Sequence, residues 1–183
     1  LRKEKLGVET RGGAMVQPWL SAKAPTPKTV LDLTLEYSFD CETLPASECY
    51  LAVERPEFYE IEVNGKKLEK KDAGFWCDIS LRRLALKPGL LKTGRNTIVL
   101  RSKYHQYLPG LESLFLLGGF GVRGDTLTAA PATLAIGDWV GQGFPYYAGN
   151  MTCRTTMDIR KEDGEKIILA IPEWRGVALA VSV

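Results

Sequence analysis

The sequence predicts an all-β protein built as an antiparallel β-sandwich, and three observations support this fold class. Short runs of alternating apolar and polar residues recur at intervals of about 8 to 12 residues. The chain contains 18 glycines and 10 prolines, which separate these runs. No segment of ten or more residues follows the 3.6-residue period of an amphipathic helix. Many short strands with frequent turns favour a sandwich or jelly roll over alternating strands and helices.

The first half of the chain contains the clearest strands. Residues 30–40 alternate strictly, with five apolar side chains from Leu31 to Phe39 on one face. Residues 49–53 and 59–63 alternate in the same way, and the second run leads into Asn64-Gly65, the preferred dipeptide of a type I′ hairpin turn. A charged tip, KKLEKKD, then precedes GFWCDI, a turn-rich stretch, and a strand at 96–104 whose buried side carries Ile98, Leu100 and Tyr104.

The second half begins with the apolar run LESLFLLGGFGVRG, residues 111–124. It predicts a buried central strand in which Gly118, Gly119 and Gly121 mark a bulge or a close approach of another backbone. Residues 126–139 predict two short extended pieces hinged at Pro131. Alternation resumes with Cys153, Thr155, Met157 and Ile159, which predicts one more strand.

The domain organisation follows from these elements. Residues 1–28 are expected to be an N-terminal extension or linker, and 29–150 the β-sandwich. Residues 151–183 are expected to start a second related β unit or to supply closing strands of the same sandwich. The run YLAVERPEFYEIEV is echoed by ILAIPEWRGVALAVSV, although similar composition could also produce that echo. The missing initiator methionine and the end within a strand-like run suggest a piece of a longer protein.

Charge and hydropathy argue against two classes of partner. The chain has 24 basic and 22 acidic residues, a net charge of +2, and no block of like charges. We therefore expect no nucleic-acid partner and no anionic membrane partner. No apolar stretch is long enough for a spanning helix, and no apolar segment follows the basic start, so a signal peptide is not predicted.

Cysteine and histidine usage argues against metal or triad chemistry. The four cysteines form no Cys-x-x-Cys pair and His105 is the single histidine, so we predict no zinc site and no catalytic residues. Cys49 and Cys153 fall on apolar phases and are expected to be buried. A disulfide between Cys41 and Cys49 is the alternative in an oxidising compartment. No cofactor is predicted, although scattered carboxylates could hold a structural calcium ion.

The most site-like stretch is GDWVGQGFPYYAGN, residues 137–150. A sugar ring needs a flat apolar platform and a few convergent polar groups, and this loop offers both. The predicted carbohydrate-binding residues are Asp138, Trp139, Gln142, Tyr146, Tyr147 and Asn150. The alternative is a loop whose aromatic residues pack on the end of the sandwich or on a neighbouring domain. Trp76 and Trp174 are more typical of core positions. A smaller cluster of Tyr104, His105 and Tyr107 predicts a loop rim.

Two groups of motifs carry a family resemblance. EFYEIEVNGKKL, FWCDI and LKTGRNTIVLRSKY resemble the sugar-binding β-sandwich domain of glycoside hydrolase family 2 and related galactose-binding-like jelly rolls. The resemblance covers roughly residues 30–104 and rests on Val63-Asn64-Gly65, on Trp76-x-Asp78-Ile79, and on Gly94-x-Asn96-x-Ile98. LESLFLLGGFGV with IGDWVGQGFPYYAGN is similar to the β-sandwich region of bacterial glycosidases of the alpha-L-rhamnosidase type.

The resemblance implies a galactose-binding-like jelly roll and a function. The implied function is a non-catalytic carbohydrate-binding or scaffolding module of a larger bacterial glycoside hydrolase, secreted or periplasmic. Its partners would be carbohydrate and the catalytic domain of the same parent chain. One alternative is a stand-alone glycoside hydrolase using paired carboxylates such as Glu112 with Asp138. The other is a protein-interaction or adhesion module.

Overall fold

The computed structural model describes residues 30–105, 108, 111, 114–147, 149–176 and 178–182. The expected extension at 1–28 lies outside these residues. The chain divides into two compact units after Tyr147. Unit 1 contains every strand of the described chain, and unit 2 covers residues 148–183.

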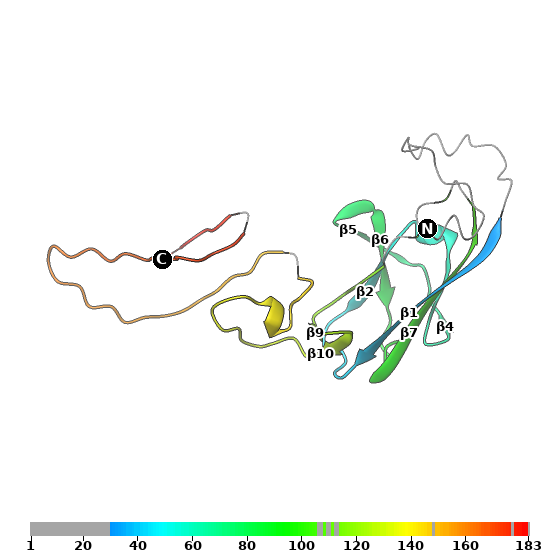
Figure 1. The fold of residues 1–183 in the computed structure, drawn as a ribbon, viewed down its shortest axis with the longest axis horizontal. Helices are drawn as coiled ribbons and strands as arrows, with labels where there is room; N and C mark the ends of the chain where they lie inside the picture. The colour runs from blue at the N-terminus through cyan, green and yellow to red at the C-terminus, as the bar shows by residue number, and fades with distance from the viewer. Residues whose placement is uncertain are drawn as a thin grey trace. The chain divides into compact units, whose positions relative to one another are not determined.

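Unit 1 is a β-sandwich, which confirms the predicted fold class (Figure 1). One sheet, sheet A, has the order β4 (Lys66–Lys67), β3 (Glu60–Val63), β7 (Gly94–Tyr104), β1 (Leu31–Cys41), β10 (Thr126–Thr128) and β9 (Gly121–Arg123). The other, sheet B, has the order β5 (Asp72–Trp76), β6 (Asp78–Leu86), β2 (Cys49–Glu54) and β8 (Phe115–Leu117). All pairs are antiparallel except β1 with β10. Two 3₁₀ turns, η1 (Pro56–Phe58) and η2 (Val140–Gln142), complete the described elements.

The centre of sheet A is the long pair of β1 and β7, which match over eleven residues. The apolar residues of β1 are partly buried and the polar ones between them are mostly exposed, as its alternation predicts. Ile98, Leu100 and Tyr104 of β7 are buried, also as predicted. The outer face carries cross-strand ion pairs such as Asp32 with Lys103 and Asp40 with Arg95. Sheet A therefore has one face in the core and one in water.

The core lies between the two sheets. Sheet B contributes Leu51, Val53 and Leu84, and sheet A contributes Ile61, Val63, Ile98 and Leu100, all at most 3% exposed. These residues occupy alternate strand positions, so each strand buries one face against the opposite layer.

The predicted Asn64-Gly65 turn is confirmed. Both residues have positive φ, 51° and 75°, as a type I′ turn requires. The Asn64 side chain donates to Leu90 O and to Asn96 Oδ1, each at 2.8 Å, and its Oδ1 accepts from Thr97 N–H at 3.0 Å. This turn residue therefore also ties the β3–β4 hairpin to the loop before β7.

The prediction of one buried central strand at 111–124 is wrong. The chain forms β8 and β9 instead, and these are edge strands of different sheets. Between them it crosses from sheet B to sheet A, and the glycines allow the crossing. A Cβ on Gly118 would lie 2.6 Å from Cys49 Sγ, and one on Gly119 would lie 2.6 Å from Ser47 Oγ. The neighbours of Gly118 and Gly119 are side chains, and only Gly121 has the predicted close backbone approach, since a Cβ on it would lie 2.8 Å from Ala129 O.

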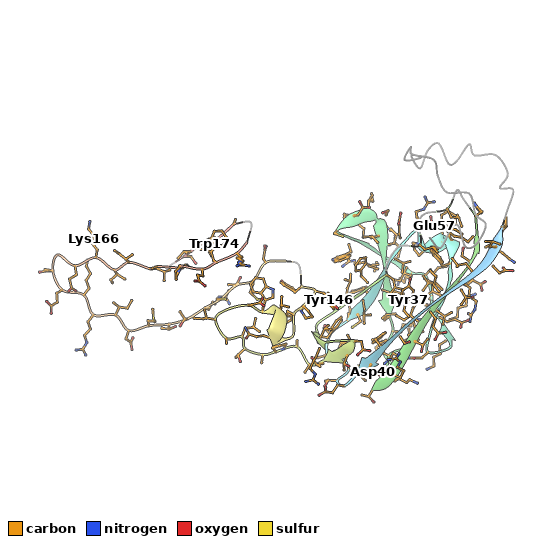
Figure 2. All side chains as sticks on the ribbon, viewed as in Figure 1. Tyr37, Asp40, Glu57, Tyr146, Lys166 and Trp174 are labelled. Carbon is orange, nitrogen blue, oxygen red and sulfur yellow. The ribbon has the colours of Figure 1, made fainter. Side chains whose placement is uncertain are left out.

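Unit 2 has no strand among its described residues, so the strand predicted from Cys153 to Ile159 is not formed. Its described residues other than Met151 are exposed, and a strand needs both a hydrogen-bonding neighbour and a face to bury. The chain reverses at Asp163-Gly164, where Glu165 N–H donates to Glu162 O at 3.2 Å. Figure 2 shows Lys166 and Trp174 projecting from this extended chain.

The cysteines are all free. Cys49 is buried, as predicted, and so is Cys41. Burial raises the pKa of both thiols, and the nearby Cys41 raises the pKa of Cys49 further. Cys77 and Cys153 are exposed, which corrects the expectation that Cys153 is buried. Cys153 is exposed because unit 2 offers it no apolar layer to pack against.

Candidate functional site

Residues 137–147 of the predicted carbohydrate loop belong to unit 1, and the loop passes beside β9. It is anchored by Val122 N–H, which donates to Gly143 O at 2.7 Å. The amide of Gln142 closes the loop on itself. Gln142 Oε1 accepts from Ala135 N–H at 2.7 Å, and Nε2 donates to Ala135 O at 3.2 Å and Asp138 O at 2.8 Å. The Gln142 side chain therefore holds the loop together instead of projecting toward a ligand.

The other predicted loop residues differ in exposure and in the contacts that they make. Asp138 Oδ1 accepts from Val140 N–H at 3.1 Å, and Trp139 is half-buried. Tyr146 is 80% exposed and Tyr147 44%, and the Tyr147 ring meets Phe144 edge-on at 5.8 Å. Asn150 is exposed and belongs to unit 2. The loop thus presents two exposed tyrosine rings, and the side chains of Asp138 and Gln142 form hydrogen bonds within the loop and with Ala135.

The remaining residues singled out from the sequence have other roles. Trp76 is half-buried and packs on Phe115 with ring centroids 4.8 Å apart, which joins the two edge strands of sheet B. Tyr104 is 1% exposed and packs with Leu108, so it is a core residue instead of part of a loop rim. Trp174 is 46% exposed, which corrects its expected core position. Tyr107 and Glu112 lie outside the described residues.

A cavity of about 480 Å³ lies elsewhere on unit 1, where sequence analysis predicted nothing. It is formed by the turn after β2, by the segment entering β5, and by β6. Its apolar lining includes Pro56 and Leu84, both buried, and Ile79, which is 73% exposed. Ser80 and five charged side chains complete it, the charged ones being Arg55, Glu57, Lys70, Asp72 and Arg82. Glu57 and Tyr146 are well separated in Figure 2, so this polar pocket and the tyrosine loop are distinct.

The charged groups of the polar pocket are held in place by one another and by the backbone. Arg55 pairs with Glu57 and Arg82 with Asp72. Lys70 Nζ donates to Tyr59 O at 3.0 Å and Pro56 O at 3.3 Å. The Arg55 guanidinium also lies over the Phe58 ring, 4.7 Å from its centroid. These contacts orient the side chains before any ligand arrives.

The backbone and the electrostatics set the polar pocket apart from ordinary surface. Arg55 has φ 50°, a left-handed conformation that is uncommon outside glycine and is found disproportionately at functional sites. Hydrogen bonds from Arg82 and from Gly74 N–H hold the pKa of the Asp72 carboxyl below its usual value. Asp72 therefore stays ionised at neutral pH and keeps Arg82 oriented.

Sequence reasoning missed the polar pocket because its residues come from three separate segments. The available local signal was charge, since KKLEKKD is the densest basic stretch and ERPE surrounds Arg55. Without the register that places β6 between β2 and β5, nothing brings Arg55, Lys70 and Arg82 together.

Comparisons with known proteins identify no family, so the fold alone defines the class of this protein. A scan against protein-family models, a search of curated proteins and a search of solved structures each found no match. The fold and the cavity define a β-sandwich protein with a small, charged surface pocket.

In the described part of the chain, no three His, Cys, Asp or Glu side chains are grouped to hold a metal ion. No helix of the described residues is long and apolar enough to cross a membrane.

Proposed function

We propose that this chain is a non-catalytic carbohydrate-binding module, and that the module belongs to a larger glycoside hydrolase. The supporting observation is the polar pocket, which combines an apolar lining with oriented Arg, Lys, Asp and Glu side chains in about 480 Å³. Sugars present an apolar C–H face and a fringe of hydroxyls, and planar charged groups bind hydroxyls well. The cavity falls within the 300–1,000 Å³ range, approximately, of known small-molecule sites.

The role within a glycoside hydrolase comes from the resemblance of the strand and turn motifs described above. The galactose-binding-like jelly roll is part of the same proposal. A module of this kind would hold substrate near a catalytic domain on the same chain.

Isothermal calorimetry of the whole chain with a panel of neutral and acidic oligosaccharides tests the proposed function. We expect saturable binding, because the polar pocket is preformed. Arg82→Gln should weaken it by about tenfold or more, since a charge-assisted hydrogen bond is lost. Tyr146→Ala is the matched control on the tyrosine loop and should leave the affinity unchanged.

The other outcomes separate the alternatives. Absence of heat with every sugar up to millimolar concentration would overturn carbohydrate binding and leave a scaffolding role. Loss of binding in Tyr146→Ala but not in Arg82→Gln would move the site to the tyrosine loop. Hydrolysis of a chromogenic glycoside by the chain would contradict a non-catalytic function.

A further inference from the structure

The polar pocket has more hydrogen-bond donors than its own acceptors occupy. Arg55 donates from Nε to Glu57, and neither of its terminal nitrogens donates to another described residue. Arg82 donates from its terminal nitrogens to Asp72 and, at 3.5 Å, to Ile79 O, while its Nε has no partner in the described chain. Each guanidinium carries five N–H groups, so several remain for a ligand. The complementary ligand is rich in acceptors.

The net charge of the polar pocket also favours a ligand that is rich in acceptors, because it is positive. Three cationic side chains face two carboxylates there, a surplus of one positive charge. Lys71 follows Lys70 in the segment entering β5 and carries a further positive charge that is not part of this count. The chain as a whole is nearly neutral at +2, so the basic character is local. A local positive potential attracts anionic ligands.

We propose that the polar pocket binds an acidic sugar, a hexuronate unit of an oligosaccharide, with the sugar carboxylate on Arg55 and Arg82. This inference rests on the proposed function and names its substrate class. The two guanidinium groups offer the planar, paired donors that suit a carboxylate. Glu57 and Asp72 accept from sugar hydroxyls, and Leu84 with Ile79 supplies apolar surface for the C–H face.

The test compares tetragalacturonate with its methyl ester, which has the same sugar backbone but carries an uncharged methyl ester in place of each carboxylate. Calorimetry at pH 7, where carboxylates are ionised, should show about tenfold tighter binding of the acid. Raising the salt concentration from about 50 to about 500 mM should weaken binding of the acid but not of the ester, because screening acts on charge.

Three variants test whether the preference for the acid over its ester arises in the polar pocket. Arg55→Gly removes the guanidinium and relieves the left-handed backbone at φ 50°, so it should stay folded and lose most of the preference for the acid. Glu57→Gln keeps an oxygen that can accept from Arg55 and from a sugar hydroxyl but removes a negative charge that repels the sugar carboxylate, so it should tighten binding of the acid several-fold. Arg123→Gln is the control, because Arg123 pairs with Glu42 outside the pocket.

Each result supports or overturns the inference. The stated preference, its salt dependence and its loss in Arg55→Gly support it. Equal binding of acid, ester and neutral sugars would overturn it while the proposed carbohydrate function stands. A preference that Arg123→Gln reduces as much as Arg55→Gly reflects general basicity and would also overturn it. Absence of binding to any sugar would overturn both proposals.

Discussion

Asn96 shows how one polar side chain stabilises this sandwich at the residue scale. Asn96 is fully buried, and its side chain makes its hydrogen bonds within the protein. Its amide nitrogen donates to Lys92 O at 2.6 Å and Gly94 O at 2.9 Å, and its Oδ1 accepts from Lys92 N–H at 3.0 Å and from Asn64. The side chain thus supplies the missing partners of a loop that would otherwise bury its backbone groups unpaired.

Replacing Asn96 should therefore lower the free energy of unfolding well beyond the average substitution. Asn96→Ala leaves several buried groups without partners, and we expect a loss of about 3 kcal/mol in urea unfolding monitored by tryptophan fluorescence. Asn96→Asp keeps the size but removes the donor to both carbonyls, so it should cost a similar amount. Ser38→Ala, on the solvent face of β1, is the control at about 0.5 kcal/mol or less. Losses of that control size in both Asn96 variants would contradict this role.

At the element scale, the crossing from β8 to β9 depends on space that only glycine leaves. The crossing passes close to Cys49 on β2, at the edge of the core. This crossing divides residues 111–124, an apolar run that looks continuous in the sequence, into two strands of two different sheets.

Gly118→Ala should destabilise unit 1 by roughly 1–3 kcal/mol, because its Cβ overlaps Cys49 Sγ at 2.6 Å. The measurement is again urea unfolding. A second background, Cys49→Ala, removes the sulfur and should reduce the cost of the Gly118 change, which a double-mutant cycle detects. Gly141→Ala, with no atom within 4 Å of the added Cβ, is the matched control. Equal costs at Gly118 and Gly141 would rule out the steric explanation.

At the scale of the whole molecule, the two units differ in the interactions that stabilise their chain. Unit 1 has two hydrogen-bonded sheets around a core, and the described residues of unit 2 have neither strands nor buried side chains. Backbone that is exposed and outside a sheet opens at little cost in free energy.

Limited trypsin digestion should therefore cut the described part of unit 2 before the strands of unit 1. We expect cleavage after Arg154, Arg160, Lys161 and Lys166 well before cleavage after Arg101 and Lys103 of β7. Mass spectrometry of a time course gives the order of cuts. Urea-unfolded protein is the control and should lose this order. Early cleavage within β7 of the native protein would show that unit 1 is not the more stable unit.

The sequence predicted those parts of the fold that depend on local patterns. The alternation in residues 30–40 and the shared apolar side of residues 96–104 predicted β1 (Leu31–Cys41) and β7 (Gly94–Tyr104), since side chains of a strand point to opposite sides in turn. Asn64-Gly65 identified its turn because few other dipeptides adopt two positive φ values. The loop at 137–150 was predicted as a site from composition, and composition does not reveal that Gln142 bonds within its own loop.

What the sequence by itself determined is the all-β class, the strands β1, β2, β3 and β7, and the turn of the β3–β4 hairpin, because periodicity and turn chemistry act over a few residues. Only the tertiary structure decided which sheet each half of residues 111–124 joins, and that residues 151–176 and 178–182 form no strand. It also decided that Arg55, Lys70 and Arg82 share one pocket. The physical reason is the same in each case, since sheet pairing, burial and charge clustering depend on neighbours distant in the chain.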